Sequence, residues 1–87
     1  MSNNSEVLPQ TTQRELTFGE KAVGITFNPG GHGAVNSIKA LSAALIDELD
    51  AMRNSTNNGE SKAQFTLAIR KIQEGQMWGV KAATWQY

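Results

Sequence analysis

Residues 33–54, GAVNSIKALSAALIDELDAMRN, decide the fold of this 87-residue chain. Large apolar residues recur there at steps of three and four positions, which is the period of one face of an α-helix. They are Val35, Ile38, Leu41, Leu45, Leu49 and Met52. The spacing predicts a helix of about six turns. The polar stretch that follows, up to Gly59, predicts a turn.

A second long helix is predicted from Glu60 to Trp85. Two long helices joined by a short connection pack antiparallel, so the two segments predict a helical hairpin. A short helix is predicted over residues 17–24, because Thr17 and Glu20 have the spacing of a capping box. Residues 25–27 are predicted to form an extended link into the hairpin. The expected fold class is therefore all-α.

Residues 1–16 are polar and offer little to a core, so they predict a flexible N-terminal arm. Residues 17–87 then make up one helical hairpin domain. A chain of this length buries only about two-thirds of the surface that its unfolded form exposes. We therefore expect additional burial between copies of the chain.

The second long helix carries two apolar stripes on different faces. One consists mostly of small residues, namely Ala68, Ile72, Gly75, Gly79 and Ala82, and the other contains Leu67, Trp78 and Trp85. A single partner helix cannot cover both faces. The pattern predicts a homo-oligomer in which one stripe packs inside the hairpin and the other packs on neighbouring subunits.

Composition narrows the possible partners. Eight basic and eight acidic residues give a net charge of zero, which argues against binding to long nucleic acid. The sequence has no cysteine, no apolar run long enough to span a bilayer and no secretory leader, so we expect a cytosolic protein without disulfides or membrane association. An anionic ligand, if bound, should be small.

The tract of residues 27–33 that leads into the first long helix suggests an anion-binding helix entrance. Gly30 and Gly31 allow positive φ and leave amide groups accessible, and the helix start adds free N–H groups. A plain turn is the alternative. Phe27 either stacks on a base or plugs the hairpin, and His32 either donates to a phosphate or is an exposed loop residue without a role.

Three further polar residues are candidates for the same kind of ligand. Asn36 and Lys39 are three positions apart on the first long helix and share a face, where they can converge on one ligand. Arg70 lies midway along the second helix. It is either a solubilising cation or, repeated around a symmetry axis, an anion site.

Catalysis finds little support in the sequence. His32 is the single histidine, cysteine is absent, and the acidic residues Asp47, Glu48 and Asp50 have no histidine at metal-ligand spacing. We expect a protein that is not an enzyme and that has no metal site and no cofactor.

Four short runs resemble the small bacteriophage anti-CBASS cyclic-nucleotide sponges, whose hairpin domain is shared with the anti-Thoeris sponges. The resemblance is greatest to the branch found in T-even-like phages. The runs are Phe18-Gly19-Glu20-Lys21-Ala22-Val23-Gly24, Phe27-Asn28-Pro29, Ala34-Val35-Asn36-Ser37-Ile38-Lys39 and Gln76-Met77-Trp78-Gly79-Val80-Lys81-Ala82-Ala83-Thr84-Trp85.

This resemblance implies a homohexamer of helical hairpins, each with a short extra N-terminal helix. It also implies sequestration of cyclic dinucleotides such as cGAMP between subunits, and of cyclic trinucleotides in separate pockets, in the cytoplasm of the infected bacterial host. Lys39 would contact the dinucleotide phosphates, Phe27 would be the stacking aromatic residue and Arg70 would belong to the trinucleotide site. Asn28 lies in the same loop and is assigned to the dinucleotide site with Gly30, Gly31, His32 and Asn36. The alternative function is an oligomeric helical adaptor or structural protein with no nucleotide ligand.

Overall fold

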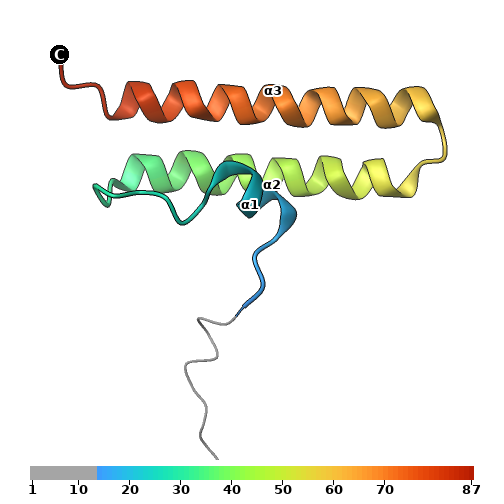
Figure 1. The fold of residues 1–87 in the computed structure, drawn as a ribbon, viewed down its shortest axis with the longest axis horizontal. Coiled ribbons are helices and arrows are strands. Elements are labelled where there is room, and N and C mark those ends of the chain that lie inside the picture. The colour runs from blue at the N-terminus through green and yellow to red at the C-terminus, as the bar shows by residue number, and fades with distance from the viewer. Residues whose placement is uncertain (1–13) are drawn as a thin grey trace, which may run out of the picture.

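The computed structural model describes residues 14–87, and this part of the chain contains three helices and no strand. The helices are α1 (Phe18–Val23), α2 (Gly33–Ser55) and α3 (Gly59–Ala83). The two long helices lie side by side and antiparallel, joined by a short connection at one end (Figure 1). The predicted all-α hairpin with a short N-terminal helix is confirmed, and the helix ends fall within one or two residues of the predicted ones.

Local capping explains where the shorter elements begin and end. The Thr17 hydroxyl accepts a hydrogen bond from the Glu20 backbone N–H at 3.1 Å, and the Glu20 carboxylate accepts one from the Thr17 N–H at 2.9 Å. This is the predicted capping box. Gly24 ends α1 in the left-handed conformation, with φ of 62°. At the start of α3, the Asn58 side chain accepts from the Ser61 N–H at 2.9 Å.

The predicted extended link over residues 25–27 is wrong for its first two residues. Residues 24–26 form a turn, in which the Ile25 N–H donates to the Glu20 carbonyl at 3.0 Å and the Phe27 N–H donates to the Gly24 carbonyl at 2.9 Å. The left-handed Gly24 reverses the chain, so the following amides reach carbonyls behind them instead of extending away.

The described end of the predicted N-terminal arm is joined to α1 by ion pairs. Arg14 binds the Glu20 carboxylate through two hydrogen bonds of 2.9 Å, and Lys21 binds Glu15 at 2.9 Å. The Arg14 side chain, followed by the Thr17 backbone hydrogen bond, lowers the pKa of Glu20 to about 2. The rest of the arm, residues 1–13, lies outside the described residues, and its flexibility stays a prediction.

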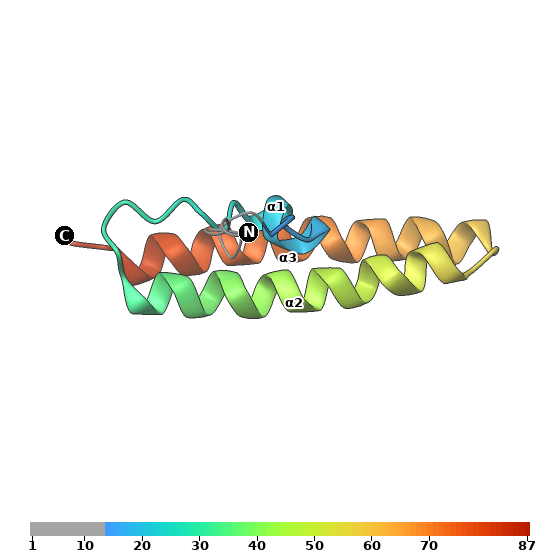
Figure 2. The ribbon, with the colours of Figure 1, turned by 90° about the horizontal axis from the view of Figure 1, so that it is seen from below.

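The core forms where α1 lies across one face of the hairpin. Val23 of α1 packs with Ala43, Ile46 and Ile69, all of which are buried. Figure 2 shows α1 and the link that follows it on one side of the α2–α3 pair, with no described segment on the other side. The short helix therefore covers only one of the two faces.

Gly19 allows α1 to approach α2 closely. Its N–H donates to the Asp47 carboxylate at 2.7 Å, and a Cβ built on Gly19 would lie 2.1 Å from the Ala43 carbonyl oxygen. No side chain fits at that distance unless the two backbones separate. Glycine at this position is thus required by the contact between the two helices.

Several large apolar residues of α2 are exposed among the described residues. Three members of the predicted periodic set, Leu41, Leu45 and Met52, are 73%, 49% and 46% exposed. The period correctly predicted the helix, but these three residues of the periodic set are not covered by the rest of the described chain. They lie on the flank of α2, because the inward positions are taken by Val35, Ala43 and Ile46, among others.

The first predicted stripe of α3, the one of mostly small residues, packs inside the hairpin only in part. Ile72 packs against the core and Gly79 faces Ile38 of α2, whereas Gly75 has open space around its Cα. The buried centre of the helix is Ile69 and Gln76, which lie outside the predicted stripe. The second predicted stripe, containing Leu67, Trp78 and Trp85, is exposed in the single chain. Within residues 14–87, no helix has the length and apolar character needed to cross a membrane.

We predict that Gly19→Ala lowers the free energy of unfolding by about 1–3 kcal/mol, because the added methyl group overpacks a backbone contact. Gly59→Ala is the matched control, since nothing lies within 4 Å of a Cβ at that position. Urea unfolding at one fixed protein concentration measures both variants. Equal stabilities for the two variants would contradict the close approach.

Candidate functional site

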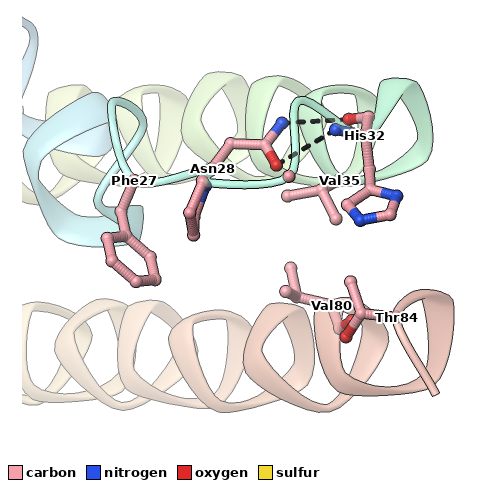
Figure 3. Close-up of a pocket in the computed structure, with 8 residues that line it drawn as sticks. Phe27, Asn28, His32, Val35, Val80 and Thr84 are labelled. Atoms are coloured by element: carbon pink, nitrogen blue, oxygen red, sulfur yellow. Dashed lines mark hydrogen bonds between the residues drawn. The ribbon is translucent and has the colours of Figure 1, made fainter. Parts of the chain in front are cut away.

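A pocket of about 290 Å³ lies between the loop that enters α2 and the C-terminal part of α3 (Figure 3). The loop contributes Phe27, Asn28, Pro29, Gly30 and His32, and the helices contribute Val35, Val80 and Thr84. In Figure 3 the Phe27 ring points from the loop toward α3. The predicted ligand-binding tract therefore forms one wall of a real concavity.

Asn28 organises this loop from within. Its Nδ2 group donates to the His32 carbonyl at 3.0 Å and to the Asn36 side-chain oxygen at 2.9 Å, while its Oδ1 accepts from the His32 N–H at 3.2 Å. Its own carbonyl accepts from the Gly31 N–H at 3.0 Å. With these bonds the Asn28 side chain fixes the loop, and Asn36 supports it from α2.

Gly31 is required by the geometry of the loop, because it has a φ of +63°, a conformation that side chains disfavour. A Cβ on Gly30 would lie 2.4 Å from the His32 ring nitrogen Nε2, a contact that rotation of the exposed imidazole would relieve. His32 is exposed and precedes α2 at the N-cap position, where its side chain makes no capping hydrogen bond. Its imidazole is available at the rim of the pocket.

Lys39 is the most unusual side chain of the site, because its charge is buried. The residue is 5% exposed, and its Nζ donates to the Gly24 carbonyl at 2.8 Å and to the Phe27 carbonyl. It also lies 5.3 Å from the centroid of the Phe27 ring. Within residues 14–87 it forms no ion pair with a carboxylate. An ammonium group has three N–H donors, so one remains after the two carbonyls.

A second pocket of about 290 Å³ adjoins Lys39. It lies between the end of α1 and α3 and is lined by Val23, Gly24, Phe27, Lys39, Gln76, Met77 and Val80. Phe27 and Val80 line both pockets. Phe27 is 71% exposed, so its ring borders both concavities with a free π surface.

The structure brings most of the predicted dinucleotide residues together. Phe27, Asn28, Gly30 and His32 line the first pocket, and Lys39 lines the second. Gly31 and Asn36 line neither pocket, although both shape the loop. Arg70 lies away from this site on α3, where its Nη1 donates to Gln73 at 3.1 Å. The structure thus does not join Arg70 to the Phe27–Lys39 region within one chain.

The residues that α3 contributes to the two pockets were not predicted from the sequence. Gln76, Met77 and Val80 of α3 line these pockets, together with Thr84, the residue that caps the end of α3. One signal was present, because Gln76 lies seven positions after Ile69 on the same helix face. A polar residue at a core-facing position of an amphipathic helix indicates a specific contact.

A helical hairpin with an exposed aromatic ring beside a buried cation defines a small ligand-binding module. Residues 20–84 match the family model described as "Acb2/Tad1, hairpin domain". The chain therefore belongs to the Acb2/Tad1 hairpin family, the family of the anti-CBASS and anti-Thoeris sponges, and membership implies sponge-like binding of cyclic nucleotides. Searches of curated proteins and of solved structures gave no match.

We predict that Lys39→Met loosens the loop, because the two carbonyls that its ammonium binds lose their donor. Amide hydrogen exchange over residues 24–32 should become faster in this variant. Lys62→Met is the matched control, since Lys62 also donates to a carbonyl, that of Arg53 at 2.9 Å, but does so at the far end of the hairpin. Unchanged exchange over the loop would refute the anchoring role of Lys39.

Proposed function

We propose that this protein sequesters cyclic dinucleotide second messengers, and cyclic trinucleotides at a separate site, without breaking them. In this proposal it blocks the CBASS defence of the bacterial host from within the cytoplasm of the infected cell. The observation that carries the proposal is the buried ammonium of Lys39, which has no carboxylate partner within residues 14–87 and lies beside the exposed Phe27 ring.

The charge of Lys39 favours an anionic ligand. A buried charge is costly unless hydrogen bonds and an opposite charge compensate it, and the two carbonyls supply only dipoles. A phosphate oxygen in the adjoining pocket would accept the remaining N–H and neutralise the ammonium. The net charge of zero fits a small anion better than a long polyanion.

The Phe27 ring favours a ligand that carries bases as well as phosphate. Stacking requires only a π surface, and this ring is held at its base by a backbone hydrogen bond and by Lys39 while most of its face stays open. A cyclic dinucleotide offers a base and a phosphate within one small molecule. Such a ligand can engage Phe27 and Lys39 together.

The uncovered face of the hairpin supports a homo-oligomer, which we propose is a hexamer. Leu41, Leu45 and Met52 of α2 are exposed in the single chain, and Gly75 of α3 has nothing within 4 Å of a Cβ at its position. A glycine inside a helix costs about 1 kcal/mol relative to alanine. Close approach of a second chain, with large side chains entering the space above the glycines, would offset that cost.

Arg70 is the residue proposed for the cyclic trinucleotide. Its guanidinium is exposed on α3, away from the Phe27–Lys39 region. Repeated around a three-fold axis, three such groups would converge on the three phosphates of one ligand. The trinucleotide site would then exist only in the oligomer.

The exposed tryptophans favour the second candidate function, an oligomeric adaptor without a nucleotide ligand. Trp78 and Trp85 are 62% and 60% exposed, and the Lys81 ammonium lies 5.5 and 5.8 Å from their ring centroids. Native mass spectrometry with 3′,3′-cGAMP and with a cyclic triadenylate separates the candidates. A hexamer carrying intact ligands supports the sponge, and an oligomer without ligand supports the adaptor.

We predict that Leu45→Glu dissociates the oligomer into smaller species, because a carboxylate would be buried against an apolar neighbour. The matched control is Ala44→Glu, which adds the same charge at an adjacent exposed position. Light scattering coupled to size-exclusion chromatography reports the mass of each. If Leu45→Glu keeps the wild-type mass, the interface lies elsewhere.

We also predict that Phe27→Leu weakens cyclic dinucleotide binding by about 5- to 150-fold, the range that corresponds to the loss of one stacked base. Calorimetric titration with 3′,3′-cGAMP measures the effect. Phe18→Leu removes an exposed aromatic ring from α1, outside both pockets, and should bind as wild type does. Equal affinities for both variants would remove Phe27 from the site.

A further inference from the structure

One hydrogen bond joins α1 to α3 within residues 14–87, and Gln73 donates it. The Gln73 Nε2 group of α3 binds the carbonyl of Ala22, in the last turn of α1, at 3.1 Å. The last carbonyls of a helix have no partner inside that helix, so a donor from elsewhere stabilises them. The Gln73 side chain therefore caps the C-terminal end of α1 from the second long helix.

The end of α1 that Gln73 holds belongs to the Phe27–Lys39 region. Val23 and Gly24 follow Ala22 directly, and both line the second pocket. The Gly24 carbonyl accepts from the Lys39 ammonium at 2.8 Å, at the point where the chain leaves α1. Gln73 itself lines neither pocket, so any effect it has on a ligand passes through the end of α1.

Arg70 fixes the orientation of the Gln73 amide. Arg70 precedes Gln73 by three positions on α3, and its Nη1 donates to the Gln73 Oε1 at 3.1 Å. A guanidinium can only donate and a backbone carbonyl can only accept, so these two partners allow a single orientation of the amide. Turning the amide by half a revolution would place N–H groups against the guanidinium and an oxygen against the Ala22 carbonyl. Arg70, Gln73 and the end of α1 thus form one connected set of hydrogen bonds.

We propose that Gln73, oriented by Arg70, is a positioning residue for the Phe27–Lys39 region and raises the affinity of that region for a cyclic dinucleotide. The inference rests on the proposed function, because it concerns the same site. It gives Arg70 a role within a single chain, separate from the trinucleotide site proposed for the oligomer. Removing the Gln73 amide should free the end of α1, and with it the part of the pocket wall that Gly24 forms.

Amide hydrogen exchange of the ligand-free protein tests the contact itself. Gln73→Met removes the donor, and Gln73→Glu keeps an acceptor for Arg70 but has no donor for the Ala22 carbonyl. Both variants should exchange faster than wild type over residues 22–27, while exchange over residues 38–50 of α2 stays unchanged. The matched control is Gln64→Met, since Gln64 donates to Glu60 at 2.9 Å within α3. Faster exchange in both segments, or unchanged exchange over residues 22–27, would overturn the inference.

Calorimetric titration with 3′,3′-cGAMP tests the effect on binding. Gln73→Met and Gln73→Glu should each bind about 2- to 10-fold more weakly than wild type, the range that corresponds to the loss of one hydrogen bond. Arg70→Met should weaken binding in the same direction, because the amide loses the partner that orients it. Lys71→Met removes the adjacent exposed cation and should bind as wild type does. Wild-type affinity in both Gln73 variants would overturn the inference.

A double-mutant cycle tests whether Arg70 acts on the dinucleotide through Gln73. If it does, Arg70→Met should cause no further loss of 3′,3′-cGAMP affinity in a protein that already carries Gln73→Met. Additive losses would overturn the orienting role of Arg70, because two residues that act independently lower the affinity independently.

The failures of the two proposals are distinguishable. If the wild-type protein binds no cyclic nucleotide, the proposed function fails and the role of Gln73 in binding fails with it, whatever the exchange over residues 22–27. If the wild type binds 3′,3′-cGAMP and both Gln73 variants bind it equally well, only the inference about Gln73 is overturned.

Discussion

The contact between the Lys39 ammonium and the carbonyls of Gly24 and Phe27 joins the fold of this protein to its candidate site. The Gly24 carbonyl belongs to the turn that ends α1, and the Phe27 carbonyl belongs to the residue whose ring lines both pockets. One side chain of α2 therefore fixes where the chain leaves α1 and where the aromatic ring stands. No carboxylate of the described residues forms an ion pair with this ammonium. The contact that holds the loop therefore leaves a buried positive charge, which a bound anion would neutralise.

The two sides of the hairpin differ, because α1 and the loop lie on only one of them (Figure 2). The side with α1 and the loop carries both pockets, because the loop and the end of α1 form walls that two bare helices would lack. Leu41, Leu45 and Met52 of α2 are exposed in the single chain, and Gly75 of α3 has open space around it. In the proposed oligomer, subunits pack through these exposed residues.

Much of the fold could be predicted from sequence because it rests on local patterns. The apolar period of residues 33–54 predicted α2, and the spacing of Thr17 and Glu20 predicted the cap of α1. Which apolar residues point inward could not be predicted in the same way. Val35 and Leu41 belong to one periodic set, yet Val35 is 2% exposed and Leu41 is 73% exposed. A set of positions three and four apart spans a wide arc, and only the neighbouring helices decide which part of it is covered.

The candidate site also combines features that follow from local sequence with features that depend on packing. The sequence by itself determined the three helices, the glycine-rich loop and the presence of Phe27, Asn28, His32 and Lys39 near one helix start, because these features depend on residues close together in the chain. The burial of Lys39 with two carbonyls, and the position of Gln76 of α3 in the wall of the same pocket, depend on how the helices and the loop pack together. The physical reason is that satisfaction of a polar group depends on every segment that packs around it, and those segments are brought together only when the helices cross.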